Sequence, residues 1–336
     1  MYRRIIAILI TLLLTVISLS SNAENIHIDQ IVNCEDAMLH LSAEVELPLA
    51  EKLPLLVVEE NHFDVDQILQ GFFSDVNEPV TIRANEDGET YITSADGTEF
   101  DFSGGVFTYR GVHYLHHYTY PEAYVKTPAE EFSDFRVEDA EAIAEKWISA
   151  LGFRDLELVF VFPMSVESLK NWKFDGQPEV TEENEGYYFR YDFTYYDVTC
   201  IPRMRNSKAH DDFIRGSELE IVITRSGIQY FSTAAGDTTY NVISKKEYDE
   251  NLATIEEAIA ILKERYNQLI ISEPIEINRI CFYYVLEPVV GNGVQKYEMW
   301  PAWLFYNLPY MEEVDAYDDG VDPLCIVNAI TREIIE

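Results

Sequence analysis

The sequence TIEEAIAILKERYNQL, residues 254–269, decides how the C-terminal part of the chain is expected to fold. Thr254 followed by Glu257 is the capping-box pattern, in which each side chain accepts a hydrogen bond from the other residue's backbone amide at a helix start. Apolar residues then recur at three- and four-residue steps, which places them on one face of a helix. After Pro274, three segments rich in β-branched and aromatic residues are typical of strands: 275–287, 296–307 and 324–335. The sequence therefore predicts a helix packed on an antiparallel sheet.

An earlier stretch of the chain repeats this order of elements. Its apolar residues between 140 and 151 form a similar helical stripe, and Gly152 follows as a stop signal. The tetrad EAIA stands at 141–144 and again at 257–260. Strand-like segments follow in matching order at 156–162, 187–200 and 219–228. The pattern predicts an internal duplication.

The part of the chain before these two units is expected to be rich in strands. Apolar and polar residues alternate from Leu39 to Leu47, residues 64–73 have the pattern of a short helix, and Asp87-Gly88 and Asp96-Gly97 are typical of hairpin turns. The predicted fold class is therefore α+β. It has a β-rich N-terminal α+β domain at 24–130, followed by two duplicated helix-on-antiparallel-sheet modules at 131–245 and 246–336.

The first 23 residues have the pattern of a secretory signal peptide. Arg3 and Arg4 precede the apolar run 5–19, and Ser21-Asn22-Ala23 supplies the small residues of a cleavage site. A helix of that length spans about 22 Å, against a hydrocarbon core of about 30 Å. We therefore expect cleavage before Glu24, secretion and no membrane insertion afterwards, with an uncleaved N-terminal membrane anchor as the alternative. No cysteine ends the run, so lipid attachment is excluded.

Charge and cysteine content exclude several classes of protein. The 60 acidic and 24 basic residues give a formal net charge of −36, and nucleic-acid binding is excluded because it requires a basic stripe. The four cysteines, Cys34, Cys200, Cys281 and Cys325, form no close-spaced pair of the kind that binds zinc. A bridge between Cys281 and Cys325 and buried free thiols are both compatible with the sequence.

Three short motifs carry a resemblance to a known family. They are Glu257-Ala258-Ile259 in the helix, Pro301-Ala302-Trp303 in a strand, and Val327-Asn328-Ala329 with Thr331 in the last hairpin. The chain resembles the PepSY-like modules, including the YycI type, of secreted Gram-positive proteins, in a family where a β domain precedes a tandem pair. The resemblance implies a regulatory role at the cell envelope. Together with the signal segment and the absence of catalytic motifs, it leads us to expect a protein or peptide partner, and we expect no cofactor. Thr331-Arg332 stands where those modules usually have Thr-Gly.

Two patterns invite a metal interpretation, and each has a simpler one. His113 and His117 would share a face of a strand, but the tyrosines around them are typical of an aromatic sheet surface. Residues 315–320 resemble the start of a calcium loop, but Tyr317 and Ile326 stand where the EF-hand register requires acidic ligands. We predict no metal site and a solvated loop at 312–322.

Aromatic residues supply the candidate binding residues. The alternating aromatics from Tyr187 to Tyr195 are expected to be core beneath the 140–151 helix. Trp300 and Trp303 fall on opposite faces of one strand, so at most one belongs to a core, and with Asn328 they are the candidate binding residues. No catalytic motif is present, so we expect a non-catalytic binding protein. Carbohydrate binding and, less favoured, a carboxylate-dependent secreted hydrolase are the alternatives.

Overall fold

The structure is a computed structural model, and it describes most of the chain between Gln30 and Ile335. The predicted signal segment 1–23 and the acidic loop 312–322 lie outside the described residues. The described ranges are 30–35, 39–45, 47–73, 79–86, 88–119, 131–170, 179–201, 204–205, 213–214, 216–233, 237–269, 273–289, 296–307 and 323–335.

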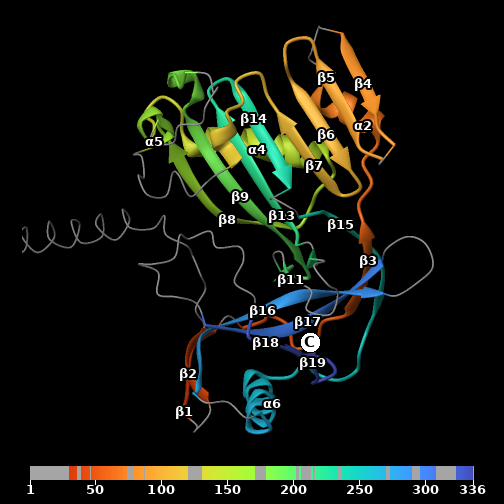
Figure 1. The fold of residues 1–336 in the computed structure, drawn as a ribbon, viewed down its shortest axis with the longest axis vertical. Helices are drawn as coiled ribbons and strands as arrows, with labels where there is room; N and C mark the ends of the chain where they lie inside the picture. Colours follow the sequence, from red (N-terminus) through yellow and green to blue (C-terminus); the bar gives the residue numbers. More distant parts are fainter. Residues whose placement is uncertain are drawn as a thin grey trace, which may run out of the picture.

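Two large sheets dominate the described residues (Figure 1). The eight-stranded sheet contains β1 (Gln30–Glu35), β2 (Leu39–Val45), β3 (Leu55–Glu60), β15 (Tyr240–Lys246), β16 (Ile275–Val289), β17 (Lys296–Tyr306), β18 (Cys325–Asn328) and β19 (Ile334–Ile335). The nine-stranded sheet contains β4 (Val80–Ala84), β5 (Thr90–Ser94), β6 (Glu99–Ser103), β7 (Val106–Arg110), β8 (Leu156–Met164), β9 (Gly186–Tyr195), β10 (Val198–Thr199), β13 (Glu218–Thr224) and β14 (Gly227–Thr233). The short strands β11 (Met204–Arg205) and β12 (Phe213–Ile214) pair with each other.

Four α-helices lie within the described ranges, and three of them are amphipathic elements that the sequence predicted. They are α2 (Val65–Phe72), α4 (Val137–Ala150), α5 (Val166–Lys170) and α6 (Ile255–Asn267). The predicted capping box is confirmed: Glu257 N donates to Thr254 Oγ1 over 3.3 Å, and Thr254 N donates to Glu257 Oε2 over 3.0 Å. Asp64 caps α2 through its side chain, and Gly152 follows α4 with φ +80°, a left-handed conformation that glycine adopts without strain.

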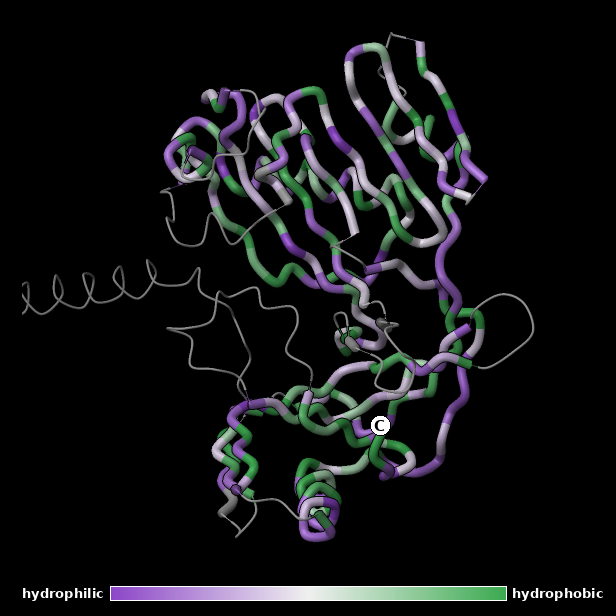
Figure 2. The backbone as a smooth tube through the Cα atoms, in the orientation of Figure 1, coloured by the Kyte–Doolittle hydropathy of each residue, from purple (hydrophilic) through white to green (hydrophobic). Residues whose placement is uncertain are grey.

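The long antiparallel hairpin β16–β17 is the centre of the eight-stranded sheet, because each of its strands pairs with different neighbours along its length. β16 pairs in parallel with β2 near its start, and its Tyr284 later pairs with Cys200. β17 pairs with β3 at Lys296–Met299 and with β18 at Ala302–Phe305. α6 lies beside this sheet, and its buried face joins the same hydrophobic core (Figures 1 and 2).

The nine-stranded sheet is covered on one face by α4 and α2. The predicted aromatic core is confirmed, because Tyr187, Phe189, Tyr191 and Phe193 of β9 are all buried beneath α4. Trp147 of α4 is half-buried, and its ring centroid lies 4.5 Å from that of Phe72 on α2. The aromatic side chains of β9 therefore form the core that the sequence indicated.

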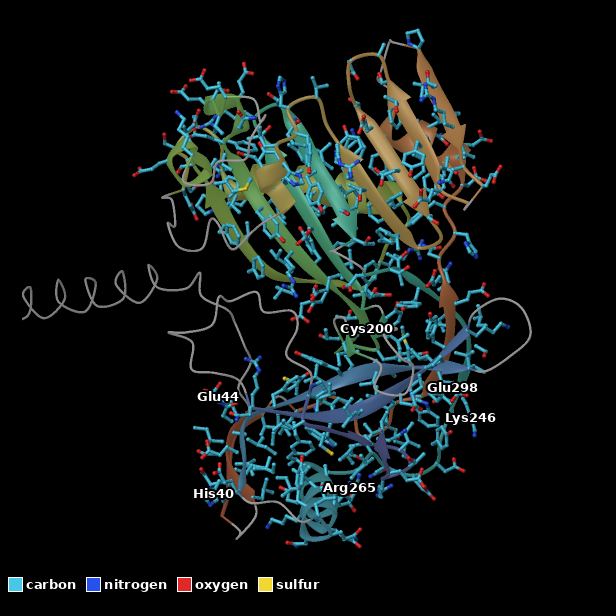
Figure 3. The ribbon with its side chains drawn as sticks, viewed as in Figure 1. His40, Glu44, Cys200, Lys246, Arg265 and Glu298 are labelled. Carbon is cyan, nitrogen blue, oxygen red and sulfur yellow. The ribbon has the colours of Figure 1, made fainter. Side chains whose placement is uncertain are left out.

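The segment at β10 contacts both sheets. β10 pairs with β9 of the nine-stranded sheet, yet Val198, Cys200 and Ile201 are buried in the core of the eight-stranded sheet. The amide of Ile201 donates to the carbonyl oxygen of Tyr284 over 2.9 Å. Figure 3 places Cys200 between the two sheets. This segment fixes β9 to β16.

The predicted fold class is wrong in its central statement. The α+β arrangement of a β-rich N-terminal domain and two duplicated helix-on-sheet modules is contradicted by a mostly β structure built on two large sheets. β1 to β3, from the segment expected to form its own domain, complete the sheet of β16–β17, whereas β4 to β7 extend the sheet of β9. The physical reason is that local periodicity identifies a strand but carries no information about its distant pairing partner.

Candidate functional site

Trp303 is a core residue. It is 1% exposed, and its Nε1 donates to the carbonyl oxygen of Ala253 over 2.8 Å, directly before the N-cap of α6. Its ring lies edge-on to Phe282 at 4.7 Å between centroids. This side chain ties α6 to β17, and no ligand reaches it while the core is closed.

Asn328 is also buried, at 4% exposure, and it acts on the turn that follows β18. Its Oδ1 accepts hydrogen bonds from the amides of Ile330 at 2.9 Å and Thr331 at 3.0 Å. Arg332 in the same turn has φ +61°, a left-handed conformation that glycine adopts more readily than arginine. Its guanidinium donates hydrogen bonds to the carbonyl oxygens of Ile330 and Asn251, and these hold the turn. The asparagine side chain therefore has a structural task.

Trp300 lies on the opposite face of β17 from Trp303, as the alternation predicted, and it is half-buried against the same core. Its Nε1 is buried without a hydrogen-bond partner among the described residues. Trp303 and Asn328 occupy neighbouring strands, β17 and β18, but point to separate backbone groups. The structure therefore does not gather the three predicted residues into one site.

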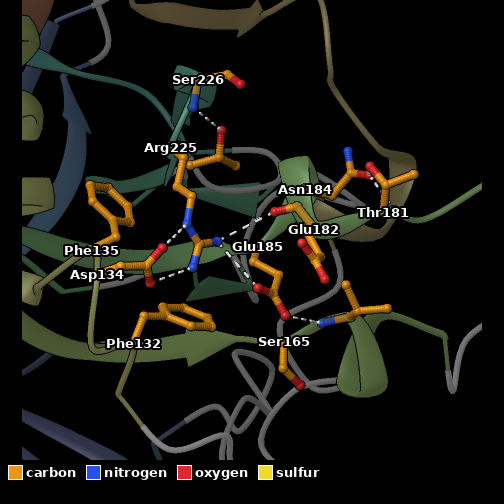
Figure 4. Close-up of polar contacts among 12 residues, drawn as sticks. Phe132, Asp134, Phe135, Ser165, Thr181, Glu182, Asn184, Glu185, Arg225 and Ser226 are labelled. Atoms are coloured by element: carbon orange, nitrogen blue, oxygen red, sulfur yellow. Dashed lines mark hydrogen bonds and ion pairs between the residues drawn. The ribbon is translucent and has the colours of Figure 1, made fainter.

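Arg225, in the β13–β14 turn, is the centre of a polar cluster (Figure 4). Its Nε and Nη2 donate to Asp134 over 3.1 and 2.8 Å, and its Nη1 donates to Glu185 Oε2 over 3.2 Å. The same Nη1 lies 3.4 Å from the carbonyl oxygen of Glu182, and the guanidinium stands 5.0 Å from the centroid of Phe132. These contacts join the segment before α4 to the end of the sheet.

The electrostatics of this Arg225 cluster identify a clamp, not a ligand site. The hydrogen bond to Asp134 raises the pKa of Arg225, and the same bond lowers the pKa of the Asp134 carboxyl. Both partners therefore stay charged at neutral pH. Because four hydrogen bonds and one ring face already occupy the guanidinium, it offers little to an incoming anion.

Replacing Arg225 with Met is expected to lower the midpoint of urea unfolding, because the segment before α4 loses its bidentate anchor. Limited proteolysis should then cut sooner near residues 131–136. Arg154→Met is the matched control, since Arg154 is exposed and makes no ion pair or hydrogen bond with any described side chain. Equal midpoints for the two variants would contradict the role of Arg225 as a clamp.

A second polar cluster lies on the face of the nine-stranded sheet opposite α4. Arg190 pairs with the buried Glu218, and the hydroxyls of Tyr188 and Tyr230 donate to Glu220 over 2.7 and 3.3 Å. Burial raises the pKa of both tyrosines well above the ordinary value, so both hydroxyls stay protonated and donate. These groups bond to one another within the sheet, although Arg190 Nε has no hydrogen-bond partner among the described residues.

Cysteine and histidine chemistry finds no support in the geometry. Cys200, Cys281 and Cys325 are buried free thiols, so the bridge between Cys281 and Cys325 is not formed. Burial raises the pKa of the Cys200 thiol well above its usual range, which keeps it un-ionised and unreactive. His113 lies on no strand, contrary to expectation, and the described residues contain no group of three or more His, Cys, Asp or Glu able to hold a metal ion.

The edge strand β4 has one side of its backbone that pairs with no described strand. It pairs with β5 alone among the described strands, and four of its five residues are exposed. Ile82 at its centre is 48% exposed. In Figure 2 hydrophobic and hydrophilic segments follow each other along this strand, as the sequence Val-Thr-Ile-Arg-Ala requires. A strand of this kind is a template for strand addition.

The register of the β4–β5 hairpin shows which backbone groups are available. The amide of Asn85 donates to the carbonyl oxygen of Glu89 over 3.0 Å, and Thr81 and Arg83 stand opposite Thr93 and Tyr91. Because hydrogen-bonded and non-hydrogen-bonded pairs alternate in an antiparallel ladder, Thr81 and Arg83 bond to β5. The amides and carbonyls of Val80, Ile82 and Ala84 therefore point away from the sheet.

β15, an edge of the other sheet, is protected in ways that β4 is not. A bulge between Val242 and Ser244 interrupts its pairing with β3, and Lys245 and Lys246 follow. Bulges and edge lysines are devices that discourage strand addition. β4 has no bulge and no lysine. Its edge position follows from the sheet topology, which no sequence motif reveals.

Comparisons with known proteins support the fold and leave the function open. A crystal structure, at 1.45 Å resolution, of an uncharacterized protein from Eubacterium rectale ATCC 33656 is similar, with a TM-score of 0.60 and 13% sequence identity. The match covers 93% of this chain and 95% of that chain, and at this identity it shows the fold alone. No family model and no curated protein match the chain, so the PepSY-like resemblance stays a prediction. Over the residues with described positions, no helix has the length and apolarity to cross a membrane.

Proposed function

We propose that this chain is a non-catalytic, extracytoplasmic binding protein that takes up an extended segment of a protein or peptide partner at the cell envelope. The outward backbone groups of β4 carry the proposal. An added strand would bond to the amides and carbonyls of Val80, Ile82 and Ala84, which supply affinity without requiring a deep cavity. The predicted signal segment motivates the location.

The physical gain from strand addition comes from two sources. Each backbone hydrogen bond contributes about 0.5–1.5 kcal/mol net, and several form together along one edge. Ile82, at 48% exposure, would also be covered by the added strand, which removes apolar surface from water. Because β4 belongs to a rigid sheet, this protein loses little conformational entropy when the segment binds.

Carbohydrate binding is the second candidate, and Tyr91 is the residue that favours it. Tyr91 is 41% exposed on the open face of β5, and its hydroxyl donates to Glu89 over 2.5 Å. An exposed ring beside polar groups is the arrangement that stacks on sugars. The buried Trp303 gives this candidate no comparable surface.

Replacing Ile82 with Pro is expected to weaken the binding of selected peptides by about tenfold or more, because proline removes one outward amide and its ring obstructs the incoming strand. Peptides would first be selected from a displayed nine-residue library on the full chain, and affinities would be measured by fluorescence anisotropy. The β4–β5 bonds should persist, since the Ile82 amide points away from β5.

Ile243→Pro is the matched control for this experiment. Ile243 is 41% exposed and lies at the bulge of β15, where proline is tolerated. Unchanged affinity for Ile243→Pro with loss for Ile82→Pro supports the assignment to β4. Equal affinity of the selected peptides for both variants and the natural protein would overturn it. Binding of glycans in place of peptides, through Tyr91, would overturn it as well.

A further inference from the structure

Arg83 is a cation on the edge of an acidic protein, and among the described residues it has no ion-pair or hydrogen-bond partner. Its side chain is exposed. Other arginines of the same sheet are paired, such as Arg110, whose Nη1 lies 2.6 Å from Asp101, and Arg225. In a chain of formal net charge −36, an arginine at a strand edge that pairs with no described carboxylate is a specific feature.

The carboxylate of Glu89, directly before the neighbouring strand β5, is already engaged. Arg83 stands opposite Tyr91 in the register, and Tyr91 donates to Glu89 Oε2 over 2.5 Å. Asn85 Nδ2 donates to the same Glu89 oxygen over 2.7 Å. Asn85 and Tyr91 therefore hold Glu89, and the guanidinium of Arg83 is left to groups beyond the edge.

The two faces of β4 favour different side chains on an added strand. Thr81 and Arg83 share one face, which is polar, and Val80, Ile82 and Ala84 share the other, which is apolar. Directly opposite side chains in an antiparallel pair have Cβ atoms about 4.5–5.5 Å apart, close enough for an ion pair. On an added strand, the residue that stands opposite Ile82 is therefore next in sequence to the residue that stands opposite Arg83.

We propose that β4 selects an extended segment in which a single carboxylate residue stands next to an apolar residue, with uncharged residues around them. This inference rests on the proposed function and names its partner chemistry. The carboxylate pairs with Arg83 and the apolar side chain covers Ile82. Because the whole chain repels anions at long range, a segment with several acidic residues is disfavoured, and one carboxylate placed against Arg83 is accepted.

The test uses two labelled nine-residue peptides, acetylated and amidated at their ends, that alternate threonine and valine. One has aspartate and the other asparagine in place of the central threonine. On the full chain, the aspartate peptide is expected to bind about two- to fivefold more tightly, the range of one cross-strand ion pair, with a smaller ratio at high salt. Arg83→Gln should remove the preference, and Arg83→Glu should reverse it.

The outcomes separate this inference from the function on which it rests. Equal binding of the two peptides to the natural protein, both lost in Ile82→Pro, overturns the selectivity of Arg83 and leaves strand addition at β4 standing. A preference for aspartate that persists in Arg83→Gln overturns it as well. Both proposals are overturned if neither peptide binds at concentrations up to about 1 mM, the Kd of a weak contact. Identical circular dichroism spectra exclude misfolding of the exposed-site variants.

Discussion

Replacing Trp303 with Ala is expected to lower the free energy of unfolding by about 3–5 kcal/mol, the range for removing a buried aromatic side chain. Trp303 is 1% exposed and packs edge-on against Phe282. The change also leaves the carbonyl oxygen of Ala253 without the donor that held it at 2.8 Å. Urea unfolding followed by circular dichroism measures the loss.

Trp300→Ala is the matched control, because this second tryptophan of β17 is only half-buried and its Nε1 donates to no described residue. Its cost should be clearly smaller than that of Trp303→Ala. If Trp303→Ala instead unfolded at the natural midpoint and lost affinity for a peptide or sugar, Trp303 would be a contact residue, as the sequence alone had suggested.

The local elements of this fold could be predicted because their signals are local. The capping box at Thr254 and Glu257 lies within four residues, and the turns at Gly88 and Gly97 each need a left-handed glycine, which both have at φ +87° and +98°. Alternation likewise placed Trp300 and Trp303 on opposite faces of β17. Such features depend on neighbouring residues alone.

The assembly of the sheets could not be predicted in the same way. Leu39 of β2 pairs with Ile275 of β16, and Leu56 of β3 pairs with Met299 of β17. These partners lie more than half the chain apart, and many apolar strands of this sequence fit one another equally well by pattern. The expected N-terminal domain therefore failed as a separate unit, because its strands complete two different sheets.

The candidate site was missed for a related reason. The strand of Thr81 to Ala84 was predicted, but its position at the end of a nine-stranded sheet depends on which strands lie beyond β5 and β14. Edge position is a property of the assembled sheet, and no residue type encodes it. An isolated arginine between apolar residues in an acidic chain is the one signal in the sequence that could have drawn attention to β4.

Replacing Gly186 with Ala is expected to destabilise the protein by more than about 3 kcal/mol, because overpacking against backbone cannot be relieved by a side-chain rotation. A Cβ atom on Gly186 would lie 2.0 Å from the carbonyl oxygen of Ile223 and 2.8 Å from Thr224 Cα. Gly186 starts β9 and stands between Met164 of β8 and Thr224 of β13, so the strands must separate at this point. The adjacent Glu185 would move with it, and the Arg225 cluster would loosen.

Gly227→Ala on the same hairpin is the matched control for this prediction. Gly227 has φ +95° and no atom within 4 Å of a Cβ, so alanine there meets backbone strain of about 1–2 kcal/mol and no clash. Thermal and urea unfolding should therefore rank the two variants with Gly186→Ala far below Gly227→Ala. If Gly186→Ala proves the milder change, the close approach of β9 and β13 is refuted. The anchoring of the segment before α4 that depends on it is then refuted too.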